Sequence, residues 1–329
     1  MSADVRADEP HISTGDLPDP ALVARLVDEA YDAFRTVRDG EVASYIPALA
    51  DADPDRFAIS VTGVRGVSFT VGDADHEFSI QSVSKPFVFA LVCEAIGYEA
   101  AREKLGVNGT GLPFNSVMAI ELNDQRTMNP MVNAGAIATT SLVPGTTADE
   151  QWDVVRSGLS RFAGHDLDID REVYESEAAT SRRNHGIAHL LNGYGCLYAD
   201  PDQAMDVYTR QCSLRVTAKD LSIMGATLAD GGVNPVTGER VVDPAVCKRV
   251  LAALATSGLY ERSGDWLFDV GLPGKSGVSG AIVTIAPGKG GMCVFSPPLD
   301  RAGNSVRGQL VTARLSEALG LNLFASKPA

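Results

Sequence analysis

The chain has 329 residues, 45% of them hydrophobic and 21% charged, an ordinary composition for a globular protein with a buried core. Its net charge of −14 disfavours nucleic acid and anionic membranes as partners, because both are bound through basic patches. Five scattered cysteines without a Cys-x-x-Cys pair favour reduced thiols over a disulfide scaffold or a zinc site. The sequence shows no secretory signal and no apolar run long enough to span a bilayer, so we expect a cytoplasmic protein.

The N-terminal part combines a tail, a helix and strands. Residues 1–18 are acidic and interrupted by prolines, which predicts a flexible tail. Asp19-Pro20 is a helix start, with aspartate as the N-cap and proline in the first turn. The alternating runs 57–61 and 67–71 predict an antiparallel hairpin, and a strand-like segment at 78–80 follows.

From residue 81 to about 230 the sequence has a helical character. Residues 87–96 are apolar on every side, as expected of a buried central helix. A further apolar helix is predicted at 186–197. Other predicted helices begin at capping residues, namely Thr147, Asp200-Pro201 and Thr217.

Strand patterns return near the C-terminus. Strands are predicted at 266–270, 281–285 and 292–295, with helices from Asp243-Pro244 and over 312–319. The order of strands, helices and strands again predicts an α+β fold, in which one antiparallel sheet with flanking helices is built from both chain ends. We expect a single domain over 19–329, with an α/β part at about 19–80 and 235–329. An inserted all-helical part covers about 81–234.

The motif Ser82-Val-Ser-Lys85 lies where the strand pattern gives way to the helical one. Residues three apart on a helix share a face, so the Ser82 hydroxyl and the Lys85 amine can meet. A desolvated lysine can remove the proton that makes a serine hydroxyl a poor nucleophile. The motif alone also fits a helix-capping serine followed by a solvated lysine.

A second conspicuous stretch is Gly271-Leu-Pro-Gly-Lys-Ser-Gly-Val-Ser-Gly280, between two predicted strands. Alone it fits a glycine-rich turn. Together with Ser82-x-x-Lys85 and the helical insertion, it resembles the layout of serine β-lactamases and penicillin-binding proteins. The chain lacks their Ser-Asp-Asn, Ser-x-Asn and Tyr-x-Asn motifs, and it lacks their export signal. The scaffold is therefore similar, while the expected substrate is different.

From Tyr45 to about Gly308 the sequence resembles the serine-dependent glutaminases, which share that scaffold. The matching segments are Tyr45-Ile-Pro, Gln81-Ser-Val-Ser-Lys-Pro, Asn129-Pro-Met-Val-Asn-Ala-Gly-Ala-Ile, Ser176-Glu177 with Asn184, Tyr208 with Cys212-Ser213, Gly238-Glu-Arg, Gly258-Leu-Tyr260, Gly271-Leu-Pro-Gly-Lys-Ser-Gly-Val, Ser296-Pro-Pro-Leu-Asp and Gly303-Asn-Ser. So many ordered matches over most of the chain are highly specific.

The resemblance implies hydrolysis of the side-chain amide of L-glutamine to L-glutamate and ammonia. Ser82 would form a γ-glutamyl ester after Lys85, biased toward the neutral amine by burial, takes its proton. Tyr260 resembles the family's active-site tyrosine, and the sequence leaves open whether it or Lys85 is the working base. The backbone N–H groups of Ser82 and Val278 would hold the oxyanion.

The remaining residues implied by the resemblance bind the amino-acid end of the substrate or support the site. Glu177 is the expected counter-charge for the substrate ammonium, although by residue type alone it also fits a solvated surface acid. Neutral hydrogen bonds would come from Tyr45, Asn133, Asn184 and Tyr208. The strand residues Lys275 and Ser276 would support Val278 and shape the local electrostatics.

No metal or organic cofactor is predicted. His185 and His189 are one helical turn apart, but they lack the glutamate of a His-Glu-x-x-His zinc motif, which favours packing or surface positions. The resemblance implies a homodimer or homotetramer. Two alternatives stay open: a β-lactamase-like or peptidase-like serine hydrolase, and a non-catalytic module that binds amino acids.

Overall fold

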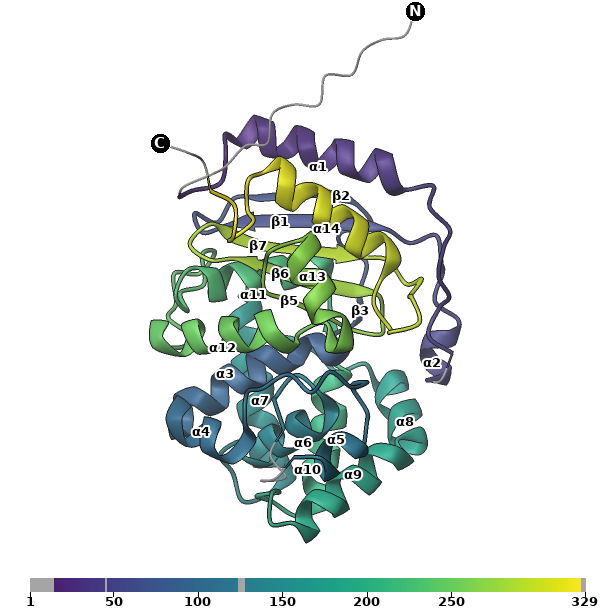
Figure 1. Cartoon of the computed structure of the whole chain (residues 1–329), viewed down its shortest axis with the longest axis vertical. Coiled ribbons are helices and arrows are strands. Elements are labelled where there is room, and N and C mark those ends of the chain that lie inside the picture. The colour runs from purple at the N-terminus through teal and green to yellow at the C-terminus, as the bar shows by residue number, and fades with distance from the viewer. Residues whose placement is uncertain (1–14, 45, 124–127, 327–329) are drawn as a thin grey trace, which may run out of the picture.

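The sheet is built from both ends of the chain, as predicted. The computed structural model describes residues 15–44, 46–123 and 128–326 and shows a mixed α+β fold (Figure 1). The antiparallel sheet has the strand order β2-β1-β7-β6-β5. Ser60 lies opposite Cys293 where the N-terminal and C-terminal strands pair. The strands are β1 (Ala58–Gly63), β2 (Ser68–Gly72), β5 (Gly274–Ser276), β6 (Ala281–Ala286) and β7 (Gly290–Phe295).

Helices cover both faces of this sheet. Alternate side chains along a strand point to opposite faces, so Val294 of β7 joins the core under α1 (Pro20–Phe34) and α14 (Val306–Ala318). Its neighbours Cys293 and Phe295 join the core on the opposite face, where α11 (Ala218–Ala229) packs against the sheet. In Figure 1, α1 lies above the sheet, α14 crosses in front of its strands and the helical part lies below it.

The helical part surrounds the buried helix α3 (Lys85–Ile96). Its other helices are α4 (Tyr98–Leu105), α5 (Met118–Glu121), α6 (Asn133–Ser141), α7 (Ala148–Ala163), α8 (Arg171–Thr180), α9 (Arg182–Gly193) and α10 (Pro201–Cys212). The short strands β3 (Phe78–Ser79) and β4 (Arg215–Val216) pair at its boundary with the sheet. The predicted division of the domain stays a prediction, and residues 1–14 of the predicted tail lie outside the described residues.

Helix starts follow the predicted caps. Asp19 accepts a hydrogen bond from the N–H of Ala21, and Thr217 forms a full capping box with Asp220. Thr147 also caps its helix, but the side chain of Glu150 turns to Thr146. The helix α12 (Pro244–Ser257) begins at the predicted cap Asp243. The short elements are α2 (Pro47–Ala50), η1 (Gln81–Ser84) and η2 (Tyr260–Arg262).

The strand predicted at 266–270 is wrong, because these residues belong mainly to the helix α13 (Ser263–Asp269). Trp266 and Val270 are four residues apart and both buried, so they share a helical face, while Phe268 between them is exposed. The Trp266 indole donates a 2.7 Å hydrogen bond to the carbonyl of Leu272, which fixes this turn against the next strand. A short apolar run cannot distinguish a strand from a helix by its pattern alone.

No helix within the described residues is both long and apolar enough to span a membrane.

Candidate active site

Ser82 and Lys85 lie in consecutive turns at the junction of the two parts. The chain leaves β3 through the 3₁₀ turn η1, and Lys85 begins α3, with its N–H donating to the carbonyl of Ser82. Gln81, just before the serine, has a φ of 49°, a left-handed conformation that non-glycine residues rarely adopt. Such strain persists only where the surroundings enforce it, and it gathers at functional sites.

The amine of Lys85 is buried beside the side chain of Asn133. Its Nζ donates a 2.7 Å hydrogen bond to Oδ1 of Asn133 and lies 3.5 Å from the carbonyl of Met131. Burial lowers the pKa of Lys85 to about 8, although Cys212 and Glu177 nearby favour the charged form. Within the described part of the chain, no hydrogen bond joins Nζ to the Ser82 hydroxyl. By the definition of the pKa, about one fifth of this amine is therefore neutral at pH 7.4.

Tyr260 packs beside both lysines. The Nζ atoms of Lys275 and Lys85 lie 3.9 and 6.0 Å from the centre of its ring, and its hydroxyl donates to the carbonyl of Ser276 at 3.3 Å. Lys275 donates to the same carbonyl at 2.8 Å. Burial raises the pKa of Tyr260 to about 12, while hydrogen bonding with Ser82 and Ser276 opposes that increase. Burial also places the pKa of Lys275 well below its usual range.

Two backbone N–H groups are available at the site. The turn 277–280 follows β5 and is closed by a hydrogen bond from Gly280 N–H to the carbonyl of Gly277. Among the described residues, no group accepts a hydrogen bond from the N–H of Ser82 or of Val278. Gly277 approaches η1 closely, since a Cβ added there would lie 3.0 Å from the Val83 side chain and 3.2 Å from the carbonyl of Ile80. The turn that carries Val278 therefore packs directly on the turn that carries Ser82.

A cavity of about 310 Å³ opens in front of Ser82. Its volume is at the lower end of the range for small-molecule sites, as suits a ligand of amino-acid size. The cavity brings together residues from η1, α6, α8, α9, α10 and the turn after β5. Six of the predicted site residues line it: Ser82, Asn133, Glu177, Asn184, Tyr208 and Val278. Tyr260, Lys275 and Ser276 are not among its lining residues, and Tyr45 lies outside the described residues.

Glu177 is a buried acid in the wall of this cavity, and its side chain is only 7% exposed. Nε2 of Gln81 donates a 3.3 Å hydrogen bond to its Oε2. Burial raises the pKa of Glu177 to about 7, against the opposing effects of Gln81 and the positive charge of Lys85. No lysine, arginine or histidine among the described residues forms an ion pair with this carboxylate. A ligand cation would therefore find a buried counter-charge here.

Asn133 joins three side chains of the site. Its Oδ1 accepts from Lys85 and, at 3.4 Å, from the hydroxyl of Tyr208. Its Nδ2 donates to Oδ1 of Asn184 at 3.0 Å, which leaves a second N–H for a ligand. The backbone N–H of Asn133 donates to the carbonyl of Phe114 at 2.9 Å and so is not free. This asparagine connects the buried amine to the cavity.

The cavity also contains residues that were not predicted as site residues. Cys212 is buried between Tyr208 and Ser84, and burial raises the pKa of its thiol far above the usual range. The ring of Phe114 packs against that of Tyr260 with 4.9 Å between ring centres and a tilt of 39° between the ring planes. The remaining unpredicted lining residues are Ile46, Gln81, Asn115, Thr180, Ser181 and Arg183. Gln81 directly precedes Ser82, and Cys212 follows Tyr208 by about one helical turn of α10. Phe114 and Asn115 carry no local signal of this role.

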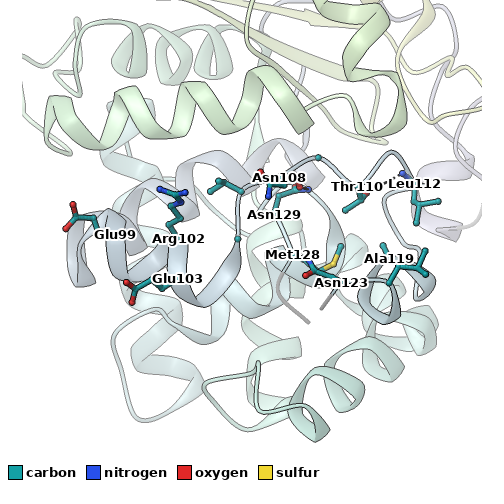
Figure 2. Close-up of a pocket in the computed structure, with 14 residues that line it drawn as sticks. Glu99, Arg102, Glu103, Asn108, Thr110, Leu112, Ala119, Asn123, Met128 and Asn129 are labelled. Atoms are coloured by element: carbon teal, nitrogen blue, oxygen red, sulfur yellow. Dashed lines mark hydrogen bonds between the residues drawn. The ribbon is translucent and has the colours of Figure 1, made fainter. Parts of the chain in front are cut away.

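A larger cavity of about 980 Å³ lies along α4 and the loop that follows it (Figure 2). Figure 2 shows Glu99, Arg102 and Glu103 on its α4 side. None of the described residues that line it also lines the cavity at Ser82. Within the described residues, no group of three His, Cys, Asp or Glu side chains is arranged to hold a metal ion, and His185 and His189 belong to no such group.

Comparisons with known proteins agree on one family. A family model described as Glutaminase matches residues 40–324. Glutaminase 2 of Yersinia pestis is 58% identical over 97% of this chain and 94% of its own length. A glutaminase of Mycobacterium ulcerans is 47% identical over 92% of this chain and 95% of its own length. A solved structure described as a probable glutaminase, ybaS, superposes with a TM-score of 0.92 at 44% identity, covering 94% of this chain and all of the other. A structure of Mglu in its glutamate form has a TM-score of 0.86 at 42% identity, covering 94% of this chain and 71% of the other.

Proposed function

The chain belongs to the glutaminase family and hydrolyses the side-chain amide of glutamine, and from that premise we propose that Ser82 is its nucleophile. The Ser82 Oγ attacks the amide carbon while its proton passes to the neutral amine of Lys85. This amine donates one N–H to Asn133, which leaves its lone pair free to accept. Of the two candidate bases, Lys85 has the pKa closer to neutrality, whereas a phenol with a pKa near 12 is almost never ionised at rest.

The negative charge of the tetrahedral intermediate is held by the N–H groups of Ser82 and Val278. Removing one such donor typically costs about 10²–10³-fold in rate. When the intermediate collapses, the C–N bond breaks and the departing nitrogen takes a proton from Lys85 through the nearby phenol of Tyr260. Ammonia leaves and a γ-glutamyl ester of Ser82 remains. Water attacks this ester with the same base, and L-glutamate is released.

The amino-acid end of glutamine is held by charge and by neutral hydrogen bonds. The buried carboxylate of Glu177 pairs with the ammonium group. The free N–H of Asn133, together with Asn184 and Tyr208, binds the α-carboxylate. Tyr45 is proposed as a further substrate contact from the resemblance alone. Lys275 and Ser276 support the strand that leads to Val278.

The observation that carries this assignment is one cavity that holds a serine, two unused N–H groups and a buried carboxylate, with a low-pKa amine beside it. The test is the release of ammonia from glutamine by wild type and by Ser82→Ala. We expect the variant to lose activity while its melting temperature and circular dichroism stay unchanged. A folded Ser82→Ala variant that keeps its activity would exclude Ser82 as the nucleophile.

Two measurements separate the alternatives. A penicillin-type hydrolase would be labelled covalently at Ser82 by a penicillin, and the absence of the Ser-Asp-Asn motif disfavours this alternative. A non-catalytic binding module would bind glutamine without releasing ammonia.

We further propose a cytoplasmic protein that needs no cofactor and assembles as a homodimer or homotetramer. Sedimentation analysis of the purified protein would test the oligomeric state.

A further inference from the structure

A buried chain of side chains leads from α6 to the peptide group before Ser82. Ser84 Oγ donates a 2.8 Å hydrogen bond to the carbonyl of Gln81. Nε2 of Gln211, on α10, donates to Ser84 Oγ at 3.3 Å, and its Oε1 accepts from the Thr140 hydroxyl of α6 at 2.9 Å. Ser84, Thr140 and Gln211 are each at most 1% exposed.

The single proton of Ser84 fixes the direction of this chain. Because that proton points to the Gln81 carbonyl, Ser84 Oγ can only accept from Gln211, so the amide NH₂ group must face it. Ser84 directly precedes α3, where a serine would ordinarily cap the helix, yet its side chain makes no capping bond. The hydroxyl is directed back at Gln81 instead.

The carbonyl of Gln81 and the N–H of Ser82 belong to one planar peptide group. In a trans peptide the C=O and the N–H point in opposite directions, and the structure has no cis peptide among its described residues. Fixing the carbonyl therefore also fixes the direction of the N–H. A hydrogen bond to the carbonyl also polarises the N–H of the same group, which makes it a better donor.

We propose that Gln211 is a positioning residue that, through Ser84, aims the N–H of Ser82 at the oxyanion. This inference rests on the proposed function, in which that N–H stabilises the intermediate. The chain also opposes the relaxation of Gln81 out of its left-handed conformation, because that relaxation would rotate the same peptide group. Since the oxyanion exists only in the transition state and the intermediate, the effect belongs in kcat and not in KM.

The test compares Gln211→Met with Gln151→Met in steady-state ammonia release. Gln151 is an equally buried amide on α7, which bonds the carbonyl of Val143 at 2.8 Å and Gln203 at 3.0 Å and does not line the cavity. We expect Gln211→Met to lower kcat at least about tenfold, up to the 10²–10³-fold of a lost donor, with KM changed less than about twofold. Gln151→Met should keep both constants, whatever its effect on the melting temperature.

Two further variants exclude a merely structural role. Ser84→Ala should match Gln211→Met, and the double variant should be no worse than either, because both act through one contact. In Gln211→Glu an ionised carboxylate cannot donate to Ser84, whereas the protonated acid can. The kcat of this variant relative to wild type should therefore increase as the pH falls from 9 to 6.

The results separate this proposal from the proposed function. If Ser82→Ala is inactive but Gln211→Met has wild-type kcat, the positioning role is wrong and the nucleophile assignment stands. A Gln211→Glu defect that is constant with pH, or additive losses in the double variant, would also overturn the positioning role. If Gln211→Met fails to fold, Ser84→Ala and Gln211→Glu decide the question.

Discussion

The proposed pairing of Glu177 with the substrate ammonium predicts that the binding of glutamine depends on pH. Burial raises the pKa of Glu177 to about 7, and in the proposal the ammonium pairs with the ionised carboxylate. The ionised fraction is about one in eleven at pH 6 and about ten in eleven at pH 8, by the definition of the pKa. KM should therefore be about tenfold higher at pH 6 than at pH 8.

The substitution Glu177→Gln keeps the size of the side chain and removes its charge. At pH 8 we expect a loss of about 2–5 kcal/mol in binding, which is the usual cost of truncating one partner of a buried charge pair. At 1.4 kcal/mol per factor of ten, KM should increase between about 30-fold and about 4,000-fold. Over pH 6–8 the KM of the variant should no longer change.

The assay is the initial rate of ammonia release at several glutamine concentrations between pH 6 and 8. KM and kcat are reported separately, because Lys85 titrates in the same range and acts on kcat. Glu175→Gln is the matched control, since Glu175 lies exposed on the same helix and should leave the pH profile unchanged. A wild-type KM that stays constant over this range, or a Glu177→Gln variant that keeps the wild-type slope, would refute the assignment.

Three other predictions follow from the same geometry. Tyr260→Phe keeps the buried ring and should keep the melting temperature, but kcat should fall about 10²–10⁴-fold; an unchanged kcat would exclude the hydroxyl from proton transfer. If Lys85 is the base, the wild-type kcat should increase with pH, pass its midpoint near pH 8 and level off about one pH unit higher. Lys85→Arg, which cannot lose its proton, should show under about 1% of wild-type kcat and no such increase. An active arginine variant would exclude Lys85 as the base. Gly135→Ala would place a Cβ 1.9 Å from a main-chain carbonyl and should cost about 1–3 kcal/mol in urea unfolding. Gly186→Ala, with no atom within 4 Å, should instead gain about 0.5–1 kcal/mol, and equal effects of the two would contradict the packing argument.

The sequence predicts most elements because their signals are local. Asp19 and Thr217 mark helix starts by their own side chains. Along the inner strands β1, β6 and β7, alternate residues face opposite cores. The local pattern of segment 266–270 predicts the wrong element, because five residues are too few to distinguish the period of a strand from that of a helix. The contacts of Trp266 favour the helix that the structure shows.

The residues of the candidate site also differ in whether a local sequence pattern can predict them. Ser82 and Lys85 can be paired from their spacing, because they lie in adjacent turns. Glu177 differs from the surface acids only because it is buried, and the spacing of residues in the sequence does not show burial. Its prediction therefore depended on the family resemblance. The contact between Ser84 and Gln211 joins residues 127 positions apart and depends wholly on how α10 packs against η1. No local pattern could have indicated it.

Strain and burial together explain why the site occupies the junction of the two parts. Gln81 and Tyr260 are the non-glycine residues with positive φ in the described chain, at 49° and 58°. They flank the proposed nucleophile Ser82 from the helical part and from the C-terminal part. A left-handed conformation costs about 1–2 kcal/mol for such residues, so each must be held by its surroundings. Gln81 is held by Ser84 at its carbonyl and by Glu177 at its side chain, and the Tyr260 carbonyl accepts a 2.7 Å hydrogen bond from Ser263. In the proposed mechanism these two strained residues set the direction of the Ser82 N–H and of the Tyr260 phenol. A regular helix or strand could not present both groups toward one atom.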